Sequence, residues 1–242
     1  MHVRTDRRRT AIRVLLLIAA ITYSGLPWEA ATGFPLDPAR SYLSELAAAD
    51  QPSGVIFRAL DGLTGVLVLV ALALGIRTPS STGLVKGSAI ALAAFAALTI
   101  IDASSPMACA TSTSLRCAAA DASNTLGLSH QIHTVSSAGA LAAVVVSALL
   151  LTIATMRDRT RSSAGGRGVL FVIAGMLIAA TVLVTVLALL STEDGRLVDG
   201  GGFAQRVQVL LVSAYLVAFG IFAVRYRAGT RREPQPESES VR

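Results

Sequence analysis

The chain has 242 residues, of which 53% are hydrophobic and only 15% are charged, whereas about 25% charge is usual in a soluble domain. Aromatic residues make up 5%, so the apolar content is almost entirely Ala, Leu, Val and Ile, as in helices that face lipid. This composition excludes a disordered chain, a disulfide scaffold and a coiled coil, and it argues against a soluble enzyme. The net charge of +6 does not indicate a nucleic-acid partner, because the basic residues stand at the ends of apolar runs.

Six segments are long and apolar enough to cross a bilayer, which takes about 20 helical residues. In chain order, the expected spans cover residues 11–27, 55–76, 84–101, 126–155, 169–190 and 204–224. Residues 1–10 would form a basic N-terminus, 11–226 the membrane domain, and 227–242 a disordered tail. The predicted fold class is therefore all-α, a polytopic membrane helix bundle with six transmembrane helices.

The charges of the connecting segments predict the orientation of the bundle. One side would carry 16 of the 21 Lys and Arg residues and 5 of the 15 acidic residues, and the other side the remainder. Because cytoplasmic loops carry the excess of Lys and Arg, both termini are expected in the cytoplasm. The first segment also fits a cleaved signal peptide, since three arginines precede its apolar run; cleavage would leave five spans in the same orientation.

The first outer loop contains the pattern of a short helix. Asp37 suits an N-cap and Pro38 the first helical position, and apolar residues recur at helical spacing over 39–47. We expect a short interfacial helix that lies on the membrane surface or caps the bundle. The alternative is a lid over an outward-facing cavity, with Tyr42 or Glu45 turned into that cavity.

Two carboxylates lie near the outer ends of predicted spans. Asp61 lies about six residues into the second span, roughly 9 Å below its start, where a charge is costly and usually faces the bundle interior. It would either form a local ion pair with Arg58, one turn away, or act as a ligand or proton-transfer group in an outer-half cavity. Asp102 ends the third span and would either enter water or be held at a fixed position by tight helix packing.

Two histidines share one face of the fourth predicted span. His130 and His133 stand at i and i+3, with Ser137 one turn further in. The spacing suits metal ligands, but a catalytic zinc usually needs three protein ligands, so Asp61 or Asp102 would have to complete the set. The candidates for metal binding or acid–base chemistry are thus Asp61, Asp102, His130 and His133, with zinc as the candidate metal. The alternative is that the two histidines form interfacial hydrogen bonds.

Cys109 and Cys117 are the two cysteines of the chain and lie in the second outer loop. The predicted orientation places this loop in an oxidising compartment, which favours a disulfide. The bridge would close a loop of about nine residues and contribute on the order of 2.5 kcal/mol. Metal binding by the two thiols is the alternative.

Taken together, these motifs resemble the bacterial membrane proteins known as the domain of unknown function 998 family. The motifs are Leu36-Asp37, Ser41-Tyr42-Leu43-Ser44-Glu45-Leu46, Phe57-Arg58 with Asp61, Asp102, the Cys109/Cys117 loop, and His130 with His133. The similarity covers about residues 11–224 and is most specific over 36–61. It implies a six-helix domain in a bacterial cell membrane and supplies no established activity.

The histidine motif is also similar to that of membrane hydrolases of the alkaline ceramidase type, which place His, Asp and Ser around zinc. The matching positions would be His130, His133, Ser137, and Asp61 or Asp102. The sequence departs from that pattern because the last two predicted spans contain no histidine.

Three function classes follow. The first is a protein that binds or senses a lipid or small amphiphile in an outer-half cavity, or supports a protein partner that the sequence does not identify. The alternative is an outer-leaflet hydrolase, metal-dependent or acid–base, that acts on a lipid-like substrate. A transporter comes third, because few charges lie at mid-membrane depth and no pair of broken helices occurs in matching halves. Membrane lipids are the expected partners in all three.

Overall fold

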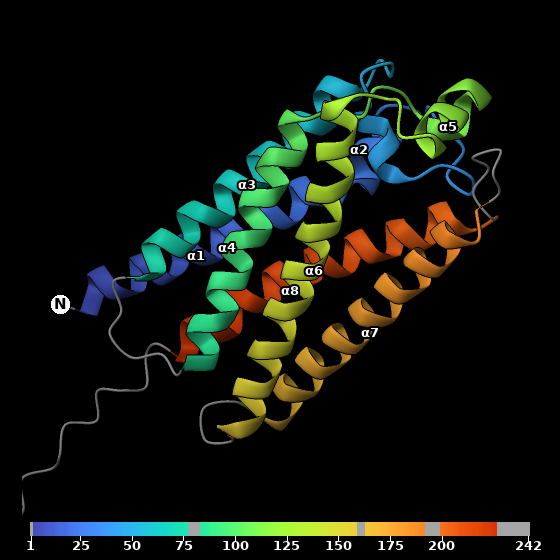
Figure 1. Ribbon diagram of the computed structural model, residues 1–242. Helices are drawn as coiled ribbons and strands as arrows, with labels where there is room; N and C mark the ends of the chain where they lie inside the picture. Colours follow the sequence, from blue (N-terminus) through green and yellow to red (C-terminus); the bar gives the residue numbers. More distant parts are fainter. Residues whose placement is uncertain (1, 77–82, 159–162, 192–198, 227–242) are drawn as a thin grey trace, which may run out of the picture.

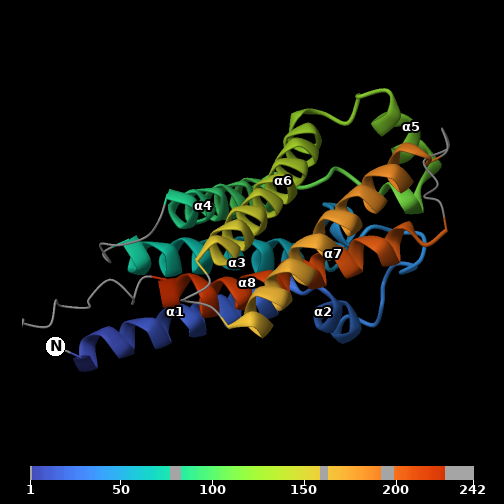
Figure 2. The same ribbon diagram turned by 90° about the horizontal axis from the view of Figure 1, so that it is seen from below.

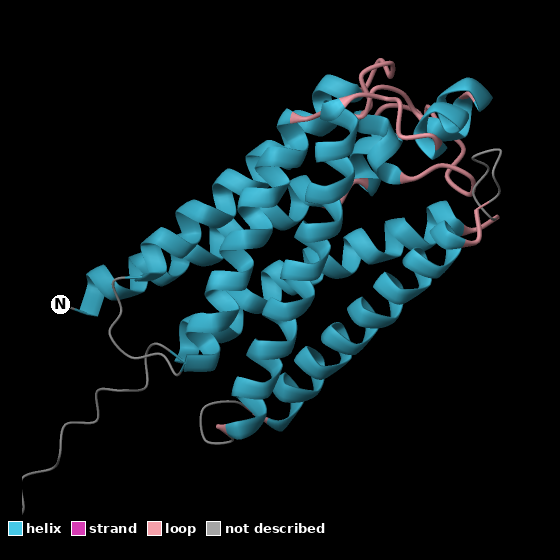
Figure 3. Ribbon diagram, in the orientation of Figure 1, coloured by secondary structure: helices cyan, strands magenta, loops and turns pink. Residues whose placement is uncertain are grey.

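The computed structural model describes residues 2–76, 83–158, 163–191 and 199–226, and every regular element in these ranges is a helix (Figure 3). The elements are α1 (His2–Tyr23), α2 (Leu26–Ala31), the 3-10 helix η1 (Leu43–Ala47), α3 (Gly54–Ile76), α4 (Gly83–Ser104), the 3-10 helix η2 (Thr111–Thr113), α5 (Leu115–Ala122), α6 (Leu128–Arg157), α7 (Ala164–Leu189) and α8 (Gly201–Tyr226). The all-α expectation is confirmed. The predicted disordered tail, 227–242, lies outside the described residues.

Five of the described helices are long and apolar enough to cross a membrane: α3, α4, α6, α7 and α8. They correspond to the second to sixth predicted spans. Helix α1, which carries the first predicted span, is not one of the five because its N-terminal half is basic. It ends at Tyr23, earlier than expected, since Gly25 adopts a left-handed conformation (φ 69°) and a separate helix begins at Leu26.

The bundle is organised around α8 and the α3–α4–α6 layer. Helix α8 packs against α1 on one side and α7 on the other, and α4 packs between α3 and α6 (Figures 1 and 2). The apolar part of α1 contributes Ile12, Leu16 and Ala19 to the same buried core as the other long helices. The outward face of α7 instead exposes large apolar side chains such as Phe171 and Val182. Such a face suits contact with lipid.

Polar side chains also join the helices inside the core. Ser88 of α4 and Ser147 of α6 each donate to the other's carbonyl oxygen at 2.8 Å, and the hydroxyl groups of Ser147 and Tyr215 of α8 lie 2.6 Å apart. Hydrogen bonds of this kind hold transmembrane helices together, because lipid offers their polar groups no alternative partner.

The segment after α2 contains only a 3-10 helix where a short interfacial helix, on the membrane surface or capping the bundle, was expected. After Asp37 the chain makes a single turn, in which the Asp37 carboxylate accepts from the Ala39 N–H at 2.9 Å. Only η1 follows, and its Leu43 and Leu46 are buried in a second apolar cluster at this end of the bundle. The segment is therefore a packed part of the fold and does not lie on its surface as an α-helix.

The segment between α4 and α6 contains the expected disulfide. Cys109 and Cys117 are bonded, with their Cα atoms 6.2 Å apart. The loop also forms a short helix, α5, which the sequence did not predict. The bridge ties the start of this helix to the segment that follows α4.

The contact between α3 and α4 depends on the absence of a side chain at Gly65. A Cβ atom there would lie 2.6 Å from the carbonyl oxygen of Ala96, whereas one at Gly62 would lie 3.7 Å from the Ala103 Cβ. We expect Gly65→Ala to lower the free energy of unfolding by about 1–3 kcal/mol. Gly62→Ala, on the same helix, is the control: it should be neutral or stabilising by up to about 1 kcal/mol. Thermal unfolding in mild detergent measures both, and equal effects would contradict the prediction.

Candidate functional site

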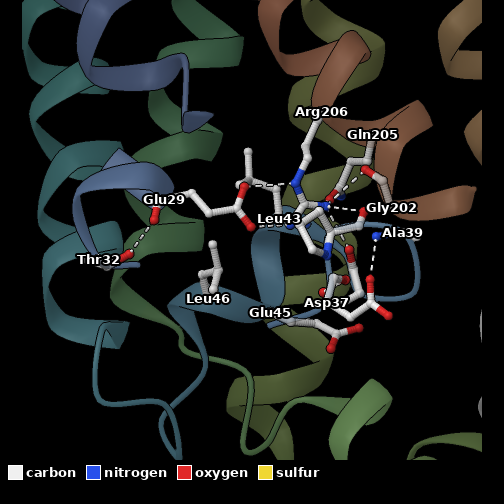
Figure 4. A network of polar contacts seen from close by, with 12 residues as sticks. Glu29, Thr32, Asp37, Ala39, Leu43, Glu45, Leu46, Gly202, Gln205 and Arg206 are labelled. Carbon is white, nitrogen blue, oxygen red and sulfur yellow. Dashed lines mark hydrogen bonds and ion pairs between the residues drawn. The ribbon is translucent and has the colours of Figure 1, made fainter. Parts of the chain in front are cut away.

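A buried ion pair joins α2 to α8 at the end of the bundle that carries the Cys109–Cys117 loop (Figure 4). The guanidinium group of Arg206 binds both carboxylate oxygens of Glu29, with Nε donating to Oε2 at 2.8 Å and Nη2 to Oε1. The side chains are 5% and 0% exposed. The remaining nitrogen, Nη1, donates to the carbonyl oxygens of Pro38, Ser41 and Gly202 at 3.0, 2.8 and 3.0 Å. One arginine therefore holds a helix, a loop and its own first turn together.

The same loop caps the N-terminus of α8. The carbonyl oxygen of Ala39 accepts from the backbone N–H groups of Gly200 and Gly202, both at 3.2 Å, and so pairs donors that a helix start leaves free. The approach is close: a Cβ atom on Gly202 would lie 2.3 Å from the Pro38 oxygen and 2.4 Å from the Ser41 oxygen. Gly202 thus gives the loop room to dock against the helix.

The docked loop places Tyr42 and η1 at the wall of a cavity. The side chain of Gln205 in α8 accepts from the N–H groups of Leu43 and Ser44, which fixes this segment. Tyr42 lines the cavity, as the lid hypothesis expected. Burial, with a smaller contribution from the negative charge of Glu45, raises the pKa of Tyr42 to about 12. Its hydroxyl group therefore stays protonated at neutral pH.

Glu45, the other lid candidate, is not among the residues that line this cavity. Its carboxylate binds the second outer loop, accepting from the Ser112 N–H at 3.2 Å and from the hydroxyl groups of Ser112 and Thr111. Burial raises the pKa of Glu45, and these hydrogen bonds partly oppose the rise. The residue thus joins the two outer loops.

The cavity has a volume of about 580 Å³ and receives side chains from α1, α3, α4, α5, α6, α7 and α8. This volume lies within the range of about 300–1,000 Å³ that small-molecule sites occupy. All four residues that the sequence suggested for metal or acid–base chemistry line it, namely Asp61, Asp102, His130 and His133. The sequence therefore located the region of the fold in which its sparse polar groups meet.

Asp102 is held in the wall by α6 and does not enter bulk water. Its Oδ1 atom accepts from the hydroxyl groups of Ser137 at 2.6 Å and Ser136 at 3.1 Å, and lies 3.2 Å from Nδ1 of His133. Its side chain is 14% exposed. Since Ser137 donates to the carboxylate and not to the imidazole, the three residues do not form the Ser–His–Asp order of a nucleophilic triad.

His130 is fully engaged elsewhere. Its Nε2 atom lies 2.9 Å from Oδ1 of Asp121, and its Nδ1 atom accepts from the Ala108 N–H at 3.3 Å. The two histidines are thus paired with different carboxylates. Within the described ranges, no three His, Cys, Asp or Glu side chains lie close enough to hold a metal ion. The four sequence candidates share a cavity without forming one ligand set.

Asp61 does not form the local ion pair with Arg58 that was one of its two interpretations. Nη1 of Arg58 donates instead to the carbonyl oxygen of Ala47 at 2.6 Å. No described residue forms a hydrogen bond or ion pair with the Asp61 carboxylate, which lines the cavity from α3. It is a carboxylate inside a helix bundle without a protein partner in the described chain, a situation that usually marks a functional position.

Two buried side-chain atoms of the described residues have neither a hydrogen-bond nor an ion-pair partner: Tyr42 Oη and Gln208 Oε1. Both residues line this one cavity. A buried polar atom without a partner costs about 1–3 kcal/mol, so the presence of these atoms around one cavity indicates a site for the polar group of a ligand.

Sequence reasoning missed Gln208, Glu29 and Arg206. The available signal was the polar group Gln205-Arg206-x-Gln208 at the start of an otherwise apolar span.

The fold and the cavity define a multi-pass helical membrane protein with a cavity of mixed apolar and polar lining at one end of its bundle. A family model described as "Protein of unknown function (DUF998)" matches residues 11–221, and the chain belongs to this family. The resemblance seen in the sequence is therefore confirmed. Comparison with curated proteins and with solved structures finds no match.

Removal of one partner from the buried ion pair should destabilise the protein strongly. We expect Glu29→Gln to lower the free energy of unfolding by about 3–5 kcal/mol, because it leaves the Arg206 charge buried and unpaired. Unfolding in detergent micelles with increasing dodecyl sulfate measures this change. The control is Arg40→Ala, which removes the exposed pair between Arg40 and Asp199 and should have little effect. Equal effects of the two variants would refute the assignment of the buried pair as the main constraint.

Proposed function

We propose that the protein binds the polar end of a small amphiphile in the 580 Å³ cavity. The observation that carries the proposal is that two buried polar atoms without a partner, Tyr42 Oη and Gln208 Oε1, belong to residues that line a single cavity. A ligand that pairs them would offset the cost of their burial. Binding sites of this kind combine mostly apolar walls with a few placed polar groups.

The other lining residues suit the apolar part of such a ligand. Phe57, Leu60, Leu141 and Val209 contribute to the same wall as the polar atoms. An amphiphile could therefore place its head group at Asp61 and its chain along these side chains. A purely polar solute would leave the apolar part of the wall uncovered.

We further propose that α1 is the sixth span, that both termini lie in the cytoplasm of a bacterial cell, and that the cavity lies in the outer half of the membrane. The start of α1, the end of α3 and the α6–α7 end of the bundle lie opposite to α2 and α5 (Figure 1). Basic residues such as Arg9 and Lys86 belong to the first end, and acidic residues such as Asp121 to the second. This distribution supports the orientation.

The second candidate function is an acid–base hydrolase acting on a lipid-like substrate. The contact between His133 Nδ1 and Asp102 Oδ1, at 3.2 Å in the cavity wall, favours it, because a carboxylate next to an imidazole can orient a general base. Turnover of an ester or amide amphiphile that is lost in His133→Ala, with binding retained, would select this candidate over simple binding.

A cavity-filling substitution tests the binding proposal. Thr134 lines the cavity from α6, and its hydroxyl group bonds only within its own helix among the described contacts. We expect Thr134→Trp to lower the fraction of purified protein that retains an amphiphile in native mass spectrometry by about tenfold.

The matched control is the next residue, Val135, whose side chain is 73% exposed on the outer face of the helix. Val135→Trp should retain the amphiphile like the unmodified protein. The same loss in both variants, or in neither, would contradict the proposal.

Reporter fusions test the orientation. A fluorescent protein fused after residue 242 should mature and emit, and alkaline phosphatase fused there should be inactive, because the first folds in the cytoplasm and the second outside it. Phosphatase inserted after Asn124, in the second outer loop, should be active. The opposite pattern would place the cavity on the cytoplasmic side.

A further inference from the structure

We propose that the head group bound in the cavity is a cation with N–H donors, a primary ammonium group. This inference rests on the proposed amphiphile binding and names the chemical class of the ligand. It follows from two separate observations, the charges that line the cavity and the kind of polar atom that the cavity leaves without a partner.

The charged groups of the cavity are one-sided. The lining residues in the described chain include the carboxylates Asp61, Asp102 and Asp121 and no Lys or Arg. Asp121 is paired with His130, and Asp102 is paired with His133 and with the hydroxyl groups of Ser136 and Ser137. Asp61 is therefore the acidic group available to a ligand.

The two nearby arginines that could have neutralised these carboxylates are used elsewhere. Arg58 donates to the Ala47 carbonyl oxygen, and Arg206 to Glu29 and the loop carbonyls. A carboxylate taken out of water needs a positive partner or hydrogen-bond donors. No described residue of the cavity is paired with Asp61 through a positive charge or a hydrogen bond. The ligand would therefore supply the positive charge and the hydrogen-bond donors.

Gln208 provides the independent observation. Its side chain is 1% exposed, and its Nε2 atom donates to Oγ1 of Thr181 at 3.0 Å. The Thr181 hydroxyl group donates to the carbonyl oxygen of Leu177 at 2.8 Å, so its single hydrogen is used and it can only accept from Gln208. The amide orientation is thereby fixed. The atom left without a partner is the acceptor Oε1.

The ligand must therefore bring donors to a wall that offers acceptors. A primary ammonium group carries three N–H donors and a positive charge, so it supplies a cation for the Asp61 carboxylate and donors for acceptors of the wall such as the Gln208 oxygen. A quaternary ammonium has the charge without the donors, and an alcohol has a donor without the charge. A carboxylate or phosphate head group would bring further acceptors to a wall that already offers acceptors.

The test compares probes with one chain length and different head groups. Protein purified in dodecyl maltoside is titrated with dodecylammonium, dodecyltrimethylammonium, dodecanol and dodecanoate, and each affinity is measured by native mass spectrometry and by the shift in unfolding temperature. Ethanolamine, which has the head group without the chain, distinguishes a soluble amine from a membrane amphiphile.

We expect dodecylammonium to bind about tenfold or more tightly than dodecanol and dodecyltrimethylammonium, and dodecanoate to bind weakest. Asp61→Asn should remove most of this preference, because it abolishes the charge at a side chain that no described contact holds in place. Gln208→Leu should weaken dodecylammonium binding and change dodecanol binding less. Asp199→Asn, at an exposed position outside the cavity, is the control and should change nothing.

Each outcome decides one point. Equal binding of all four probes, or an unchanged preference in Asp61→Asn, would overturn the ammonium inference. If Thr134→Trp nevertheless abolished that binding, the amphiphile cavity would stand; if it changed nothing, the proposed function would fail as well. Ethanolamine binding as tight as that of dodecylammonium would support the ammonium site and overturn the amphiphile as its source.

Discussion

The ion pair between Glu29 and Arg206 is the constraint on which the cavity end of the protein depends. Two charges out of water are favourable only when their geometry is good and their remaining donors are paired. Arg206 meets this condition by binding both carboxylate oxygens and three carbonyl oxygens. These carbonyls belong partly to the loop before η1, so the pair fixes that loop, and the loop in turn carries Tyr42 to the cavity wall.

The polar groups near the cavity divide into those that build it and those that face its interior. Glu45, Arg58 and Arg206 bind backbone or loop partners and serve the architecture. Asp61 and Gln208 present acceptors that the described chain leaves unused. The division matters because a polar group inside a membrane bundle is costly. Because most polar groups near the cavity have partners within the protein, Asp61 and Gln208 are the candidates for ligand contact.

Local sequence information predicted the long helices well and the outer end poorly. The second to sixth spans follow from runs of apolar residues, and the disulfide from two cysteines on one loop. The Glu29–Arg206 pair was missed because its members are 177 positions apart; Glu29 looked like an ordinary loop charge, and Arg206 stood at the start of the sixth predicted span. The helical pattern of 39–47 was overridden by contacts with α8, since the Ala39 carbonyl oxygen accepts from the Gly202 N–H and the Leu43 N–H donates to the Gln205 side chain.

The loop after α2 caps the start of α8, so displacement of this loop is coupled to fraying of that helix end. The Ala39 carbonyl oxygen closes the start of the helix, and the loop beyond it forms part of the cavity wall. Any displacement of that loop toward water would at once free the Gly200 and Gly202 amides and remove two of the acceptors around Arg206. Opening of the cavity wall at this loop would thus require fraying of the first turn of α8.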